Sequence, residues 1–131
     1  MFLIDTNIFL EILLKQEKSN EARQFLTTIN PEEINVTDFS VYSIGIVLIK
    51  LGEPNLYLKW LEDLVESGAK VIRVGFNDMK VLTNAVKKYK LDFDDAYQYT
   101  VAKKNNLKIV SFDKDFSKTD KKAKTPGELK N

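Results

Sequence analysis

The sequence predicts an α/β fold with a mainly parallel central sheet covered by helices on both faces. Four short apolar runs are typical of buried strands, and they lie at residues 1–4, 33–36, 70–74 and 107–112. The segments between these runs are longer and carry apolar residues at helical spacing. Strands that alternate with helices favour a parallel sheet with helices packed on each side.

The first part of the chain carries two helix signals between two strand signals. Residues 7–16 and 19–30 each have apolar side chains at helical spacing, and Pro31 marks the end of the second segment. The segment Glu33-Ile34-Asn35-Val36 is then the second candidate strand. We therefore expect two helices between the first strand and the second.

A longer helix is expected to begin with Thr37 or Asp38 as its cap and to end at Gly52. Its apolar residues surround the helix on nearly every side, and they are Val41, Ile44, Ile46, Val47, Leu48, Ile49 and Leu51. Such a helix is buried by its own fold or by another subunit. A core position is the first expectation, and a dimer surface over residues 41–51, where Gly45 permits close approach, is the alternative.

The second half of the chain continues the alternation. Pro54 suits the first turn of a helix that ends at Gly68. After the third strand, Asn77 is expected to cap a further helix, and another helix begins near Asp92 and ends around residues 105–106. That last helix leads into the fourth predicted strand.

The composition narrows the possible chemistry. A chain of 131 residues with 44% hydrophobic and 30% charged residues is typical of one soluble globular domain, which we expect to span residues 1–131. The absence of cysteine and histidine excludes thiol nucleophiles, Ser-His-Asp triads and imidazole zinc sites. Carboxylates remain as the plausible catalytic groups. No signal peptide precedes Asp5 and no apolar run approaches about 18 residues, so we expect a cytoplasmic protein without a membrane partner.

Aspartates follow two of the predicted strands. Asp5 comes directly after the first apolar run, and Asp113 and Asp115 follow the last one. Each has an ordinary explanation as a helix cap or a turn residue, and so do Asp94 and Asp95 near a helix start. Because the carboxyl ends of parallel strands form one edge of a sheet, these carboxylates are expected to converge there and to repel one another unless a cation binds. The pattern favours a Mg²⁺ or Mn²⁺ site.

Three motifs together resemble the PIN domain. They are a strand followed by Asp5-Thr6-Asn7, a helix opened by Asp95-Ala96, and the run Ile109-Val110-Ser111-Phe112-Asp113-Lys114-Asp115-Phe116. The resemblance covers nearly the whole chain in length and element order, and it is in particular to the toxin nucleases of VapBC-type toxin–antitoxin pairs. It implies a three-layer α/β/α fold with a mainly parallel central sheet and a divalent-metal site made by about four acidic residues.

The resemblance also implies roles for individual residues. Asp5, Asp95 and Asp113 match three catalytic acids that bind the metal. Asp115 matches an accessory acid, and Asp94 is a further candidate metal ligand. The residues expected to support the site are Thr6, Asn7, Asp38, Ser43 and Ser111.

The sequence departs from the family pattern at one acid. The family usually has a glutamate on the helix after the second strand, and that place falls at Ser43. Asp38 or Asp94 is the alternative source of the missing carboxylate. Two hypotheses therefore stay open: a nuclease, and a catalytically weak or inactive PIN-like module that binds RNA or protein.

The resemblance implies a metal-dependent endoribonuclease that hydrolyses RNA phosphodiester bonds with Mg²⁺ or Mn²⁺. The expected partners are RNA, a second copy of the chain in a homodimer, and a small antitoxin protein. Residues 101–131 carry nine lysines against four acids, and the candidate RNA contacts there are Lys103, Lys104, Lys114 and Lys118. Tyr97 and Tyr99 are expected in the core, with base stacking as the alternative.

Overall fold

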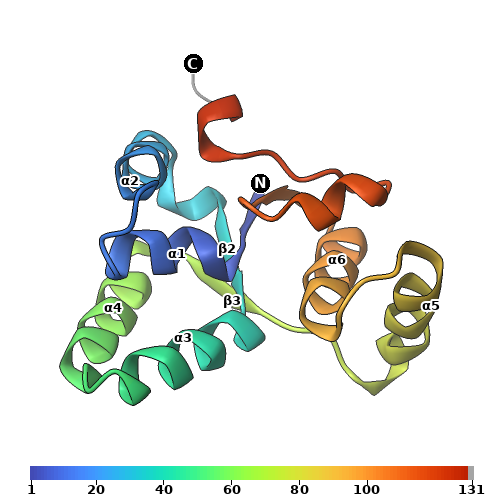
Figure 1. The fold of residues 1–131 in the computed structure, drawn as a ribbon, viewed down its shortest axis with the longest axis horizontal. Helices are drawn as coiled ribbons and strands as arrows, with labels where there is room; N and C mark the ends of the chain where they lie inside the picture. Colours follow the sequence, from blue (N-terminus) through green and yellow to red (C-terminus); the bar gives the residue numbers. More distant parts are fainter. Residues whose placement is uncertain (130–131) are drawn as a thin grey trace.

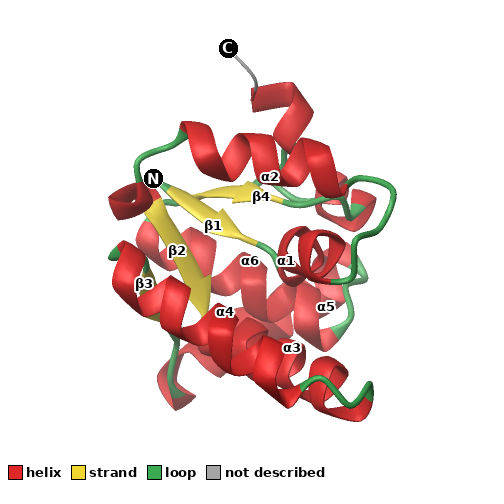
Figure 2. Cartoon of the chain, turned by 90° about the vertical axis from the view of Figure 1, so that its left-hand side faces the viewer, coloured by secondary structure: helices red, strands yellow, loops and turns green. Residues whose placement is uncertain are grey.

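The computed structural model describes residues 1–129 and has a parallel sheet between two groups of helices (Figure 1). Within this part of the chain the sheet has four strands in the order β3-β2-β1-β4. All three strand pairs are parallel, and the strands are β1 (Phe2–Ile4), β2 (Ile34–Thr37), β3 (Lys70–Ile72) and β4 (Lys108–Val110). Figure 2 shows the arrows of β1, β2 and β4 side by side. The predicted three-layer α/β/α fold with a mainly parallel sheet is confirmed.

The helices cover both faces of the sheet. Those on one face are α1 (Thr6–Leu13), α2 (Ser19–Thr28), α3 (Asp38–Lys50) and α4 (Pro54–Ser67), and those on the other are α5 (Met79–Tyr89) and α6 (Phe93–Asn105) (Figure 1). Successive residues of a strand point to opposite faces. Accordingly Leu3 and Ile109 pack in the core beneath α5 and α6, whereas Ile4 and Val110 pack in the core beneath α1 to α4.

The ends of the elements follow local signals, with two corrections. Thr37 caps α3 by accepting a hydrogen bond from the backbone N–H of Ser40, and Gly68 ends α4 in the left-handed conformation, as expected. Asn77 does not cap α5, because it lies inside a 3₁₀ helix, Phe76–Asp78, that precedes α5 directly. The third and fourth strands are also shorter than predicted, since apolar runs continue past the residues that pair.

One side of the apolar helix α3 packs in the core, and the opposite side is exposed. Ile44 and Leu48 are fully buried, as the core interpretation predicts. The opposite side is exposed, and its large apolar residues, between 58% and 69% exposed, are Tyr42, Ile46, Ile49 and Leu51. A Cβ at Gly45 would lie 2.8 Å from the Tyr57 ring, so this glycine permits the close approach of α4 to α3.

The segment after α6 covers the outer side of β4. Lys124 forms a parallel bridge with Val110, and its backbone N–H donates to the carbonyl of Ile109 at 3.0 Å. The backbone N–H of Ser111 donates to the Lys124 carbonyl, also at 3.0 Å. These bonds occupy the free edge of β4, which edge strands generally need to have protected. Among residues 1–129, no helix combines the length and the apolar character that crossing a membrane requires.

Candidate functional site

The candidate site lies where β1 and β4 end and α6 begins. Asp5 follows β1 directly, and its backbone N–H donates to the carbonyl of Val110 at 2.9 Å. Asp113 follows the neighbouring strand β4 and caps the 3₁₀ helix Lys114–Lys118. Asp95 lies in the first turn of α6. Parallel strand order therefore brings together acids from opposite ends of the chain, as the sequence predicts.

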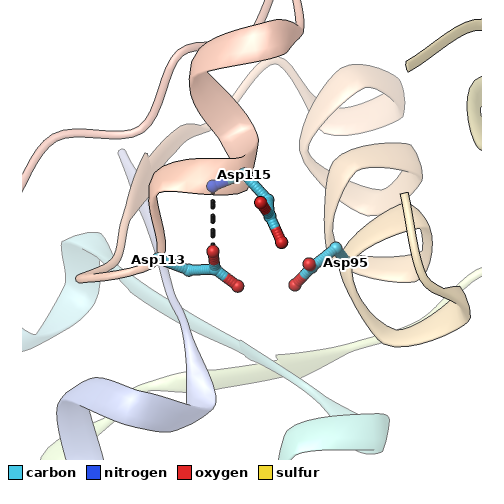
Figure 3. Close-up of side chains that lie close together, drawn as sticks. All are labelled: Asp95, Asp113 and Asp115. Carbon is cyan, nitrogen blue, oxygen red and sulfur yellow. Dashed lines mark hydrogen bonds between the residues drawn. The ribbon is translucent and has the colours of Figure 1, made fainter. Parts of the chain in front are cut away.

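Three carboxylates form a tight acidic cluster. Asp95, Asp113 and Asp115 each offer an oxygen atom within 4.8 Å of those of the other two, and Figure 3 shows their side chains pointing toward one another. The backbone N–H of Asp115 donates to Asp113 Oδ1 at 2.9 Å, which ties the acid that caps the 3₁₀ helix to the acid inside it. Carboxylate oxygens at this spacing suit a hard cation such as Mg²⁺ or Mn²⁺.

A cavity of about 190 Å³ adjoins this cluster. Its acidic lining comes from Asp5, Asp94, Asp95 and Asp113, and the rest of its lining is Thr6, Asn7, Leu10, Phe39, Ser43 and Gln98. Asp95 and Asp113 thus belong to both the cluster and the cavity. The two groups of acids are contiguous and form one site.

Asp5 is fixed by donors from four residues. Its Oδ1 accepts hydrogen bonds from the Thr6 backbone N–H at 2.9 Å and from Gln98 Nε2 at 2.8 Å. Its Oδ2 accepts from Ser111 Oγ at 2.6 Å and from Asn7 Nδ2 at 3.4 Å. The structure therefore brings the predicted supporting residues Thr6, Asn7 and Ser111 to Asp5.

Burial and mutual repulsion disfavour the charged forms of the site acids. Burial raises the pKa of Asp5. The hydrogen bonds that Asp5 accepts from Gln98 and Ser111 lower this pKa, but burial has the larger effect. Burial, followed by the nearby charges of Asp113, Asp94 and Asp5, raises the pKa of Asp95 to about 8. A divalent cation would offset this repulsion, so the electrostatics of the site match its donor atoms.

The raised pKa of Asp95 predicts a pH dependence of stability in the absence of metal. The folded protein holds the Asp95 proton up to about pH 8, whereas the unfolded chain loses it near pH 4. The stabilising contribution is therefore complete below about pH 4 and is lost as the pH rises to about 8. In EDTA, we expect Tm to fall between about pH 5 and pH 8. Thermal unfolding checks this, and an equally steep fall in Asp95→Asn would contradict it.

Asp94 and Asp38, the two candidate sources of the missing carboxylate, lie in different parts of the structure. Asp94 and Ser43 both line the cavity. Asp38 instead accepts hydrogen bonds from Tyr97 Oη at 2.7 Å and from the Phe39 backbone N–H at 2.8 Å, and it is absent from the cavity lining. The geometry favours Asp94 over Asp38, because only Asp94 faces the same cavity as Asp5.

The predicted RNA-contacting lysines fall into two pairs. Lys103 and Lys104 form ion pairs with Asp120 and Asp78, respectively. Lys118 Nζ lies 3.7 Å from Asp115 Oδ1, and Lys114 is exposed directly after Asp113. Lys114 and Lys118 are thus beside the acidic cluster, whereas the other two are held by carboxylates elsewhere.

The tyrosines of α6 occupy the core. Tyr97 and Tyr99 are both buried, and their hydroxyl groups donate to Asp38 and Asp120. The core interpretation is confirmed for both. Base stacking by these rings would need them to leave the core.

Two site residues escaped the sequence interpretation. Gln98 lines the cavity and bonds Asp5, and Ser40 connects Gln98 to Thr6. The available signal was helical spacing, because Gln98 follows Asp94 by four positions and Asp95 by three, which places all three on one side of α6.

The chain is similar to known proteins in its sequence pattern and in its fold. The family model of the PIN domain matches residues 2–122. Among solved structures, the chain is similar to a toxin–antitoxin complex from Klebsiella pneumoniae, with 22% identity, a TM-score of 0.78, and coverage of 98% of this chain and 100% of that one. No curated protein sequence gives a significant match.

Two further structures are similar at lower identity. VapC20 from Mycobacterium tuberculosis, described as a Sarcin-Ricin loop cleaving toxin, has 14% identity and a TM-score of 0.77, over 89% of this chain and 93% of that one. FitAcB from Neisseria gonorrhoeae has 18% identity and a TM-score of 0.74, over 98% of this chain and 100% of that one. At these identities the similarity shows the fold.

Proposed function

This chain belongs to the PIN domain family, and from that premise we propose that it is a divalent-metal-dependent endoribonuclease, the toxin of a VapBC-type toxin–antitoxin pair. The observation that carries the proposal is the convergence of Asp95, Asp113 and Asp115, with Asp5 in the adjoining cavity. PIN domains are typically metal-dependent nucleases, and the similar structures include toxins of such pairs.

The proposed roles follow from the placement of each acid. Asp95 and Asp113 belong to both the cluster and the cavity, so they are the central metal ligands, and Asp5, Asp94 and Asp115 complete the set from either side. Bound Mg²⁺ or Mn²⁺ supplies an activated water and neutralises charge on the phosphate. Thr6, Asn7 and Ser111 hold Asp5 in one orientation. The lack of histidine in the chain is compatible with this chemistry, because carboxylates hold the cation.

Cleavage of labelled single-stranded RNA tests the proposal. We expect the wild-type protein to cleave with Mg²⁺ or Mn²⁺ and not with EDTA, and Asp113→Asn to lose the activity. The matched control is Asp63→Asn, since Asp63 is an exposed acid of α4 paired with Lys59. If the folded wild-type protein cleaves RNA with neither Mg²⁺ nor Mn²⁺, the nuclease proposal is contradicted. RNA binding without cleavage would favour the inactive binding module, for which Ser43 in the cavity lining is the specific reason.

Toxin function predicts an effect on growth. Expression of the chain in a bacterial host is expected to arrest growth, because uncontrolled RNA cleavage stops translation, and Asp113→Asn is expected to be harmless at equal expression. We further propose a small antitoxin protein as partner, in keeping with the similar toxin–antitoxin complexes. Equal growth inhibition by both proteins would contradict the toxin proposal.

The lysines beside the cluster are proposed to contact RNA phosphates. Lys114→Ala and Lys118→Ala are each expected to weaken RNA binding and to reduce the slope of log affinity against log salt by about 0.7. Lys103→Ala is the control, because Lys103 pairs with Asp120, outside the acidic cluster, whereas Lys118 lies beside Asp115 of the cluster. Fluorescence anisotropy at several salt concentrations measures this. If Lys103→Ala reduces the slope of log affinity against log salt by the same amount, the proposal that Lys114 and Lys118 are specific RNA contacts is contradicted.

The exposed side of α3 is proposed to form a homodimer interface. Tyr42, Ile46 and Ile49 line a shallow cavity of about 470 Å³ with Tyr57, and apolar surface of this kind typically marks an interface. Ile46→Glu is expected to convert a dimer into a monomer in light scattering with size-exclusion chromatography. Val81→Glu is the control on α5, on the other face of the sheet. A monomeric wild type, or a dimeric Ile46→Glu protein, would contradict the interface.

A further inference from the structure

Gln98 occupies a buried position at the centre of the candidate site. It is 2% exposed, lines the cavity, and lies on the same side of α6 as Asp94 and Asp95. Both hydrogen atoms of its amide group have partners, because Nε2 donates to Asp5 Oδ1 at 2.8 Å and to Ser40 Oγ at 2.9 Å. A glutamine side chain thus connects the N-terminal acid to α3.

The carboxylate of Asp5 fixes the orientation of this amide, and the surrounding hydroxyl groups are compatible with it. Ser40 Oγ accepts from Gln98 Nε2 and from Thr37 Oγ1, which occupies both of its acceptor positions. Its single proton is then directed to Thr6 Oγ1, 2.7 Å away. A reversed amide would place Gln98 Oε1 against the carboxylate oxygen of Asp5, which is itself an acceptor. The amide therefore keeps Nε2 toward Asp5.

This orientation leaves Gln98 Oε1 without a partner. Among the described side chains it is the one buried polar atom that lacks a hydrogen bond. A buried acceptor without a partner costs about 1–3 kcal/mol, and such groups in native proteins commonly mark functional sites or bound water. The side chain that carries this free acceptor also lines the acidic cavity, where a bound cation would bring water molecules that can donate hydrogen bonds.

We propose that Gln98 is a positioning residue of the cation site, which holds Asp5 through Nε2 and accepts a hydrogen bond from water of the bound cation through Oε1. The inference rests on the proposed metal-dependent function. Residues that orient metal ligands typically change metal affinity by about 10–100-fold when they are replaced. Gln98 would supply the orientation without adding a further negative charge to acids that already repel one another.

Metal binding without RNA tests the role of Gln98. Isothermal titration with Mn²⁺ is expected to show at least about tenfold weaker binding by Gln98→Met than by wild type. Methionine has a similar length and lacks both the donor and the acceptor. Gln24→Met is the matched control, because Gln24 is an exposed residue of α2. Wild-type Mn²⁺ affinity in folded Gln98→Met would overturn the inference, since a purely structural glutamine would affect Tm alone.

Gln98→Glu provides a second, independent variant. Its carboxylate would face Asp5 where the amide donated, so Tm in EDTA is expected to fall below that of wild type. Mn²⁺ is then expected to raise Tm by more than it does in wild type, because the cation relieves an additional repulsion. A rise equal to that of wild type would overturn the inference even if Gln98→Met fails to fold, because the variant both loses the Nε2 donor and gains a charge at this position.

The wild-type titration separates the two proposals. A wild-type protein that does not bind Mn²⁺ would refute the metal site and the role of Gln98 together. Wild-type binding that is unchanged in both Gln98 variants would refute only the role of Gln98 and leave the proposed nuclease intact.

Discussion

Replacing Asp95 with asparagine is expected to abolish RNA cleavage and to make the metal-free protein more stable. Asparagine keeps the shape of the side chain but loses the charge that would hold the cation. The loss of one group that stabilises charge in an active site costs about 10²–10³-fold in rate. Because burial and the nearby carboxylates of Asp113, Asp94 and Asp5 raise the pKa of Asp95 to about 8, its charge is unfavourable in the folded protein.

Two measurements check the expected loss of RNA cleavage and the expected gain in stability of Asp95→Asn. Thermal unfolding at pH 8 in EDTA is expected to give a Tm for Asp95→Asn a few degrees above wild type, since about 1 kcal/mol shifts Tm by roughly 4 °C in a domain of this size. The same protein is expected to lack cleavage in Mg²⁺ or Mn²⁺. Asp63→Asn, an exposed control on α4, should change neither. Lower stability of Asp95→Asn in EDTA would show that repulsion does not dominate this site.

Replacing Ser43 with glutamate is expected to increase Mn²⁺ affinity and cleavage by about tenfold or more. Ser43 lines the cavity with Asp5, Asp94, Asp95 and Asp113, so a longer acidic side chain would bring a further carboxylate to the acids. An additional oxygen ligand and an additional negative charge both strengthen binding of a hard cation. The same charge should lower Tm in EDTA, because it adds to the existing repulsion.

Ser43→Gln is the matched control for this gain. Glutamine has the size of glutamate without its charge, so it is expected to leave Mn²⁺ affinity near or below the wild-type value. Titration calorimetry and cleavage rates measured side by side distinguish the two variants. Equal behaviour of Ser43→Glu and Ser43→Gln would show that position 43 does not contribute to the cation site.

The acids could be placed from the sequence because their positions depend on strand order. Asp5 and Asp113 follow strands, and parallel strands end at the same edge of a sheet, so their convergence needs no knowledge of side-chain packing. The role of Gln98 depends on the approach of α3 to α6 at Ser40, which local sequence does not encode. The ion pairs of Lys103 and Lys104 likewise involve acids distant in the sequence.

The position of α3 shows a second limit of local patterns. Its apolar residues surround the helix, and only packing decides that Ile44 and Leu48 turn inward while Ile46 and Ile49 turn outward. Strand ends have the same limit, since the apolar run at 70–74 continues beyond the pairing of β3, which ends at Ile72. Hydrophobicity indicates that a residue prefers burial, but tertiary contacts decide which residues obtain it.

The pairing of the first strand with the last determines when the site can form during synthesis. Asp5 is made before its hydrogen-bond partner Ser111, which lies 106 positions further along the chain. A nascent chain that ends before β4 lacks Asp113, Asp115 and the strand that pairs with β1 on one side. Contacts of such long sequence separation form late. A nuclease built in this way would remain inactive until β4 and the residues that follow it have been synthesised.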